Sequence, residues 1–239
     1  ATEPPSSPLR EEPRHVDPGV ALRFALGFGA AGLAAPAELD HALGRAGRSE
    51  LGTAIGPAAL VRLGVELSGF AIDLVPSATF FPEPDARHAT TQSSEALMVE
   101  VGYDALPSAF VRFGPAVGAG AVRSLLCVSG QGTSPADASV FGQLAAAPGP
   151  GVCLARVDAA LRLGLAGGVA ATVYEAPFAT QFTLDLRPSL TWALGDADYA
   201  APDLEELGAF PGPAPGRIGL SLLLEAGVAF GYGRRTPGI

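Results

Sequence analysis

Large apolar residues alternate with small or charged residues along eight segments of this 239-residue chain. In residues 20–29, for example, Val20, Leu22 and Phe24 share one parity, and Arg23 lies on the other with alanine and glycine. Such period-two alternation is typical of a β-strand with two unlike faces. The eight segments are 20–29, 59–68, 70–74, 97–103, 109–120, 156–165, 182–194 and 218–231. The pattern predicts an all-β, antiparallel protein.

The chemistry of the two faces favours a membrane-spanning barrel over a soluble β-sandwich. Hydrophobic residues make up 48% of the chain and charged residues only 16%, against about 25% charged in ordinary soluble domains. The polar faces hold mostly Gly, Ala and Ser with one or two charges each, whereas the water-facing side of a sandwich carries many. A tilted strand needs about 9–11 residues to cross a bilayer. We therefore expect an up-and-down transmembrane β-barrel of about eight strands, with its large apolar residues toward lipid.

The connections between the segments alternate in length, as in outer-membrane barrels, which have short periplasmic turns and longer external loops. Long connections are expected at 33–50, where a charged run can form a helix, and at 82–94, 124–152 and 195–216. Short ones are expected at 68–69, 104–108 and 166–168. An even number of strands places both chain ends on the periplasmic side. The predicted organisation is a periplasmic tail at 1–17, a barrel at 18–232 and a C-terminal tail at 233–239.

Residues 169–181 are too many for a turn. Val169, Ala171 and Val173 either lengthen the sixth strand, with the turn moved to 175–178, or begin the seventh strand with a bulge near Pro177. At this stage ten strands remain an alternative to eight.

Strand number, loop alternation and face chemistry make residues 18–232 resemble the small OmpA/OmpX-type outer-membrane barrels. That resemblance implies an integral protein of the bacterial outer membrane, in contact with the lipid bilayer. The last strand ends in aromatic residues, Phe230 and Tyr232, as it does in such barrels. Because amphipathic rings favour membrane interfaces, we expect Tyr103 and Tyr232 near the periplasmic interface and Trp192 near the external one. The first residue is Ala1 rather than Met, which agrees with export through the periplasm.

The charged residues of the polar faces are balanced, six Arg against six carboxylates. An eight-stranded barrel has an interior just wide enough for side chains to fill, where unpaired charges are costly and matched ones are tolerated. We therefore expect a salt-bridged plug rather than an open path for solutes. The predicted interior network comprises Arg23, Arg62, Glu66, Asp73, Glu100, Arg112, Arg156, Asp158, Arg162, Asp185, Arg187 and Glu225.

The two cysteines, Cys127 and Cys153, flank the third long connection, one after the fifth predicted strand and one before the sixth. Adjacent antiparallel strands would bring them together, and an oxidising compartment would join them in a disulfide. Closing a loop of this length stabilises a protein by roughly 3–4 kcal/mol on the chain-entropy model.

Catalysis, cofactors and metals receive little support. The histidines, His15, His41 and His88, fall in the tail and in external connections, and only chance-level pairs such as His41 with Asp40, or His88 with Asp85 and Ser93, suggest acid–base chemistry. We expect no enzyme, no catalytic residue, no cofactor and no metal site. The net charge of −9 argues against nucleic-acid binding, which needs a basic surface.

Three functions follow from this sequence. We favour a structural or surface-exposed monomeric barrel whose long external loops contact a partner of unknown identity. The second is a narrow porin-like channel for small solutes or ions. The third is a soluble lipocalin-like binder, although such a barrel would place its large apolar residues inside.

Overall fold

The predicted alternation closes into a barrel of eight antiparallel strands, each paired with its neighbours along the chain and β1 with β8. The computed structural model describes residues 16–48, 51–81, 90–105, 110–130, 139–147, 149–175, 177–195, 197–214 and 216–235. The strands are β1 (Val16–Ala34), β2 (Thr53–Leu67), β3 (Phe70–Phe81), β4 (Thr90–Tyr103), β5 (Val111–Gly130), β6 (Gly149–Glu175), β7 (Phe178–Leu194) and β8 (Ile218–Arg235). The helices are α1 (Ala37–Arg45), α2 (Val140–Ala146) and the 3-10 turn η1 (Glu205–Leu207).

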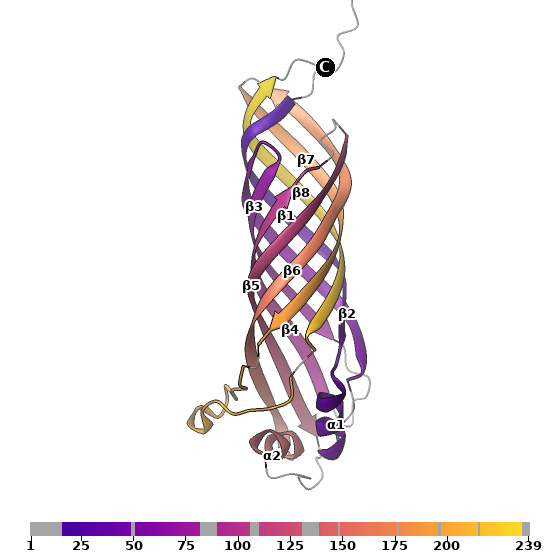
Figure 1. Ribbon diagram of the computed structural model, residues 1–239, viewed down its shortest axis with the longest axis vertical. Coiled ribbons are helices and arrows are strands. Elements are labelled where there is room, and N and C mark those ends of the chain that lie inside the picture. The colour runs from indigo at the N-terminus through magenta and orange to yellow at the C-terminus, as the bar shows by residue number, and fades with distance from the viewer. Residues whose placement is uncertain are drawn as a thin grey trace, which may run out of the picture.

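The register of the strands sets the shape of the barrel. A line from Arg123 on β5 through successive paired residues passes Glu95, Ala78, Ala59, Phe28, Leu224, Leu186 and Gly167 and returns to β5 at Phe113, ten residues away. With eight strands, this stagger tilts each strand by about 40° from the barrel axis. Figure 1 shows the strands crossing that axis obliquely. About ten residues of such a strand span the roughly 25 Å apolar belt of a membrane barrel. Because β5 has 20 residues and β6 has 27, both extend well beyond that belt.

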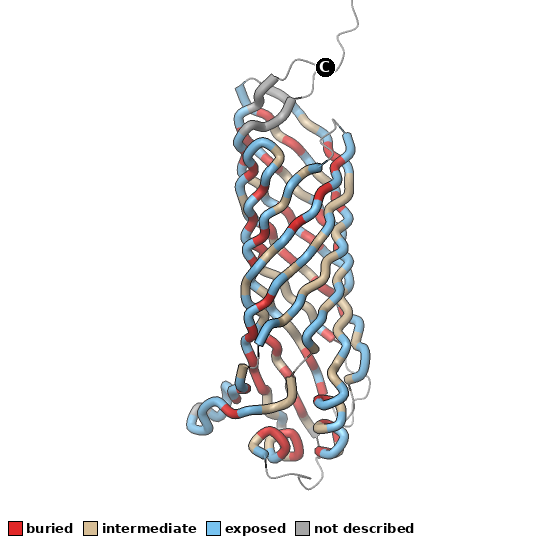
Figure 2. The backbone as a smooth tube through the Cα atoms, viewed as in Figure 1, coloured by how far each residue is buried: buried red, intermediate tan, exposed pale blue. Residues whose placement is uncertain are grey.

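The two faces of the wall are as different as the sequence predicts. Large apolar side chains lie on the outside, where Leu22 is 68% exposed and Phe28 65%. Charged side chains lie inside, where Arg62 is 2% exposed. Figure 2 shows burial and exposure alternating along the strands. A continuous outer belt of exposed Val, Leu, Ile and Phe fits lipid, not water. It is also the inverse of a lipocalin-like binder.

The turns confirm eight strands and correct one boundary. Ser68 and Gly69 join β2 to β3 with positive φ values of 48° and 85°, as in the tight primed turns of hairpins. Residues 166–168, predicted as a turn, instead lie inside β6, which runs on through 169–175, and Glu175 pairs with Phe178 at the start of β7. Gly168 is paired with Asp185 of the neighbouring strand β7, and a Cβ atom at this position would overlap the Asp185 side chain. The glycine is therefore needed for space, although in the sequence it resembles a turn residue.

We call the end of the barrel where β1 starts and β8 ends the terminal end, and the opposite end the cap end. At the cap end, α1 and α2 lie beyond the strands (Figure 1). A separate apolar core gathers there from α1, α2, the inner faces of β5 and β6, and the segment 197–214, which we together call the cap. Its buried members are Leu39, Leu43, Ala46, Leu126, Val128, Phe141, Ala145, Ala146, Leu154, Tyr199, Ala201 and Phe210. None of the helices in the described ranges is long and apolar enough to cross a membrane.

Candidate functional site: the barrel interior and the cap

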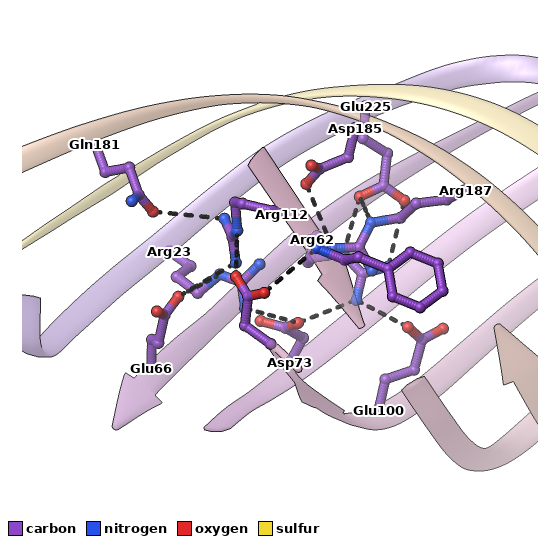
Figure 3. A network of polar contacts seen from close by, with 12 residues as sticks. Arg23, Arg62, Glu66, Asp73, Glu100, Arg112, Gln181, Asp185, Arg187 and Glu225 are labelled. Carbon is purple, nitrogen blue, oxygen red and sulfur yellow. Dashed lines mark hydrogen bonds and ion pairs between the residues drawn. The ribbon is translucent and has the colours of Figure 1, made fainter. Parts of the chain in front are cut away.

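Arg62 stands at the centre of the interior charges (Figure 3). Its Nη1 lies 3.0 Å from Asp73 Oδ2 and 2.8 Å from Glu100 Oε2, and its Nε lies 3.1 Å from Glu225 Oε2. The four side chains come from β2, β3, β4 and β8, and each is at most 4% exposed. Hydrogen bonds between ionised groups are the strong ones, so this cluster ties together strands that are not all neighbours.

Four more arginines surround that centre. Arg187 lies 2.9 Å from Glu225 and 3.7 Å from Asp185, and Arg162 lies 3.1 Å from Glu100. Toward the terminal end, Arg23 and Arg112 approach Glu66 at 3.5 and 3.8 Å. We call these five arginines and five carboxylates the polar layer. Its members are Arg23, Arg62, Glu66, Asp73, Glu100, Arg112, Arg162, Asp185, Arg187 and Glu225. Within this set the charges are equal in number, and buried charges that are paired in this way are tolerated.

Glycines make room for the carboxylates. Four carboxylates are paired with glycines on the neighbouring strand: Glu225 with Gly27, Asp73 with Gly64, Glu100 with Gly118 and Asp185 with Gly168. A Cβ atom on Gly27 would lie 2.8 Å from Glu225 Cγ, and one on Gly118 would lie 2.7 Å from Glu100 Cγ. These four glycines therefore have a specific role, because each leaves the space that a neighbouring acid fills.

The structure divides the predicted twelve-residue constellation into two sites. Arg156 and Asp158 lie near the cap end, where Arg156 Nε is 2.8 Å from Asp158 Oδ2 and Arg156 also donates to Gly195 O. The guanidinium lies 5.8 Å from the centre of the Tyr199 ring. This pair is buried and lies beside the cap, whereas the ion pairs of Arg62 gather the charges nearer the terminal end.

Two polar residues of the interior escape the sequence reasoning. Asp104 accepts a 2.8 Å hydrogen bond from Arg112 Nε, and Gln181 lies within 3.5 Å of Arg112 Nη1. Asp104 lies in a predicted turn and Gln181 in the ambiguous stretch 169–181, so neither had a face assigned to it. The inward position of the cationic Arg112 was the available signal that a partner should lie nearby.

An apolar layer separates the polar layer from the cap end. It consists of Ala58, Leu60, Val75, Met98, Ala160 and Leu223. On β3, the inward side chains run Asp73, Val75, Ser77 and Thr79 toward the cap end, and on β8 they run Glu225, Leu223 and Ser221. Cavities among the polar-layer residues measure about 10 to 30 Å³, which is room for one or two waters each.

The cap is fastened to the barrel by a disulfide and by Arg48. Cys127 and Cys153 form the predicted disulfide, although they lie within β5 and β6 as directly paired residues, not beyond the strand ends. Arg48 Nε donates to Ala145 O at 2.7 Å and its Nη2 to Ala147 O at 2.9 Å, while Nη1 donates to Ser129 O. One side chain thus joins the end of α2, whose last carbonyls lack helical partners, to β5.

Tyr199 anchors the segment between β7 and β8. Tyr199 and Phe210 pair in an isolated bridge, Ala200 pairs with Ala155 of β6, and the Tyr199 hydroxyl donates to Pro213 O at 2.8 Å. Burial raises the pKa of Tyr199 above its ordinary value of 10.0. Between these anchors, the part of the chain around η1 stands out from the side of the barrel (Figure 1), and Leu204 and Leu207 are 39% and 44% exposed on it.

The predicted interface aromatics lie on the outer face. Tyr103 packs on Phe70 with ring centres 4.6 Å apart, and Tyr232 packs on Phe178 at 5.0 Å, both toward the terminal end. Trp192, 53% exposed, lies toward the cap end of β7. On β4 and β5, the outward ion pair of Glu95 and Arg123, 3.4 Å apart, ends the apolar belt on the cap side.

The histidines that were considered for acid–base chemistry do not form a site in the described residues. His41 is exposed on α1, and Asp40 beside it accepts hydrogen bonds from the backbone N–H groups of Leu51 and Gly52. Ser93 points outward on β4. His15, Asp85 and His88 lie outside the described residues. Within the described ranges, no group of three or more His, Cys, Asp or Glu is placed to hold a metal ion.

No family model and no curated protein matches the sequence. Neisserial surface protein A is a similar solved structure, with a TM-score of 0.44 and 14% identity over 88% of this chain and 96% of that one. A major outer membrane protein from Thermus thermophilus has a TM-score of 0.38 and 13% identity, over 90% of this chain and 99% of that one. The outer membrane protease OmpT from Escherichia coli has a TM-score of 0.37 and 9% identity, over 92% of this chain and 98% of that one. At such identities the similarity concerns the fold alone.

Proposed function

We propose that this chain is an integral outer-membrane protein whose barrel is a non-conducting anchor that presents the cap outside the cell. The observation that carries the proposal is the filled interior. The polar layer, the apolar layer and the cap core succeed one another along the barrel axis. Water-filled pores belong to wider barrels, while eight strands leave only space that side chains fill.

The outer-membrane location is supported by the belt and the connections. Closed barrels with an outer apolar belt of about 25 Å, short turns at one end and long connections at the other are typical of that membrane. The short turn at 68–69 and the paired ends of β6 and β7 at Glu175 and Phe178 lie at the terminal end, and the long connections at the cap end. In this orientation the cap is extracellular and its disulfide lies in an oxidising environment.

Planar-bilayer recording with the pure, refolded protein tests the central claim. We expect no stepwise conductance, and a known porin recorded in the same bilayers provides the sensitivity control. Stepwise channels from the unaltered protein would overturn the proposal and favour the narrow channel. Gel migration with and without heating in detergent tests insertion as a folded barrel.

The cap is proposed to act by contact with a protein partner, because Leu204 and Leu207 present apolar surface on a braced segment beyond the lipid belt. Apolar side chains held in water by a fixed backbone are typical of contact sites. Photo-crosslinking from position 207 in intact cells should give a discrete adduct, whereas position 22, on the lipid face, should not. Identical patterns from both positions would contradict this role.

We further propose that the chain is monomeric. We also propose that it is not an enzyme, since Asp40 accepts hydrogen bonds from the backbone after α1 and does not orient His41 as a base. A lipid A hydrolysis assay with the pure protein, with a known hydrolase as the positive control, checks the second statement. Release of fatty acid or phosphate above the rate of a heat-unfolded sample would refute it.

A further inference from the structure

A chamber of about 80 Å³ lies between the apolar layer and the cap. Because a water occupies roughly 10–15 Å³ on this measure, the chamber has room for about five to eight non-hydrogen atoms. It lies where inward residues change from Val, Leu and Met to hydroxyl-bearing ones. Six hydroxyls line it, from Ser77, Thr79, Ser94, Ser124, Thr191 and Ser221.

Arg162 forms the floor of the chamber. Its Nε donates to Thr191 Oγ1 at 3.0 Å, its Nη1 to Glu100 Oε1 at 3.1 Å and its Nη2 to Ser77 Oγ at 3.3 Å. A guanidinium has five N–H donors, so two remain for a ligand. Its only ion-pair partner in the described residues, Glu100, is shared with Arg62 at 2.8 Å.

The walls are selective for an anion with polar substituents. None of the hydroxyls of Thr79, Ser94 and Ser124 has a hydrogen-bond partner within the described part of the chain. The described lining residues include two arginines, Arg162 and Arg217, and no carboxylate. Arg217 is exposed just before β8, so the chamber meets the surface beside a cation, despite the net charge of −9 for the whole chain.

We propose that this chamber binds a small hydroxylated carboxylate from the external medium. Arg162 would hold the carboxylate, because the planar guanidinium matches it and charge-assisted hydrogen bonds are strong. The free hydroxyls would accept and donate to the ligand's own hydroxyls, and the alanine walls would cover its short carbon chain. The apolar layer below blocks passage onward, so the chamber binds without transporting. This ligand site goes beyond the proposed anchoring function and does not depend on it.

Glycerate and glycerol distinguish this class of ligand, because they share a skeleton and differ by the carboxylate. Calorimetric titration of the refolded protein in zwitterionic detergent should give a Kd for glycerate of about 1–10 mM, and binding of glycerol at least about tenfold weaker. Equal binding of the two compounds, or no binding of glycerate at ~100 mM, would overturn the proposal and leave a chamber of structural water.

Two variants locate the binding. Arg162→Gln should weaken glycerate binding about tenfold or more by removing the charge. Ala96→Leu fills the chamber from β4 and should abolish binding. The matched control is Ala121→Leu, which makes the same change on the lipid face of β5 and should bind as the unaltered protein does. Arg162→Gln is informative only if it shows the heat-dependent gel shift of a folded barrel; otherwise the comparison of Ala96→Leu with Ala121→Leu is the test. Glycerate binding that is retained by Ala96→Leu would refute the site.

Discussion

Removal of Arg62 is the sharpest test of how the polar layer stabilises the barrel. In Arg62→Met, Glu100 keeps Arg162 at 3.1 Å and Glu225 keeps Arg187 at 2.9 Å. Asp73, 3% exposed, keeps only Arg23 at 3.8 Å. The variant therefore leaves one buried carboxylate nearly uncompensated, and breaking a buried pair in this way costs about 3–5 kcal/mol.

The same geometry predicts a rescue. Adding Asp73→Asn removes the uncompensated charge and restores equal numbers of cations and anions, so the double variant should recover about 2 kcal/mol or more of the loss. Arg123→Ala serves as the control, because its ion pair with Glu95 is solvent-exposed and such pairs contribute about 1 kcal/mol or less.

The assay is urea unfolding in lipid vesicles, followed by the fluorescence of Trp192, the only tryptophan, which faces lipid. The free energies of unfolding of the unaltered protein, Arg62→Met, Asp73→Asn and the double variant form a double-mutant cycle, and Arg123→Ala is its control. If Arg62→Met costs less than about 1 kcal/mol, or if Asp73→Asn adds to its cost, the polar layer is not a mutually compensated network and the reasoning fails.

Three further perturbations test other parts of the structure. Replacing Cys127 and Cys153 with Ser should destabilise the cap by about 3–4 kcal/mol, seen as faster hydrogen exchange in α2 with the barrel's heat-dependent gel shift retained; unchanged exchange would contradict this. Gly27→Ala should cost about 1–3 kcal/mol through overlap with Glu225, whereas Gly32→Ala, whose nearest neighbour is 3.8 Å away, should be near neutral in urea unfolding. Because folding raises the pKa of Tyr199, the folded state holds this proton more tightly, so cap stability should fall as pH rises above about 10; Tyr199→Phe should remove that slope in exchange measurements, and an unchanged slope would exclude Tyr199 as its source.

The sequence predicts most of the barrel because lipid imposes one rule on every strand. The alternation assigns the charged residues of the predicted strands to the inner face and most of their leucines to the outer face. It therefore predicts that Arg62 and Glu225, which are 163 residues apart, both point into the barrel, where they form a hydrogen bond. The rule gives a wrong strand boundary where a glycine is present because there is no room for a side chain, as at Gly168, and not because the chain turns there. It also gives no register between strands, so that Arg156 was grouped with charges that lie deeper in the barrel.

The cap could not be predicted from the same pattern. Tyr199 and Phe210 have no periodic neighbours, and their contacts depend on how far β5 and β6 continue past the membrane. That length is hidden in the sequence because the outward faces there change to residues such as Arg123, which resemble loop residues. Only the two cysteines, with their separation of 26 residues, indicated that these strands remain paired.

The pairing of Glu225 with Gly27 has a consequence for assembly. If β8 joined β1 one residue out of register, every side chain would change face, and Glu225 would point into lipid. A slip of two residues would keep it inside but set it either against Ala25, whose Cβ fills the space that Gly27 leaves, or against Gly29, which lies further from the row of Arg62. Glu225 thus helps to set the register in which β8 pairs with β1, because only one alignment of these strands gives its side chain both a space and a counter-ion.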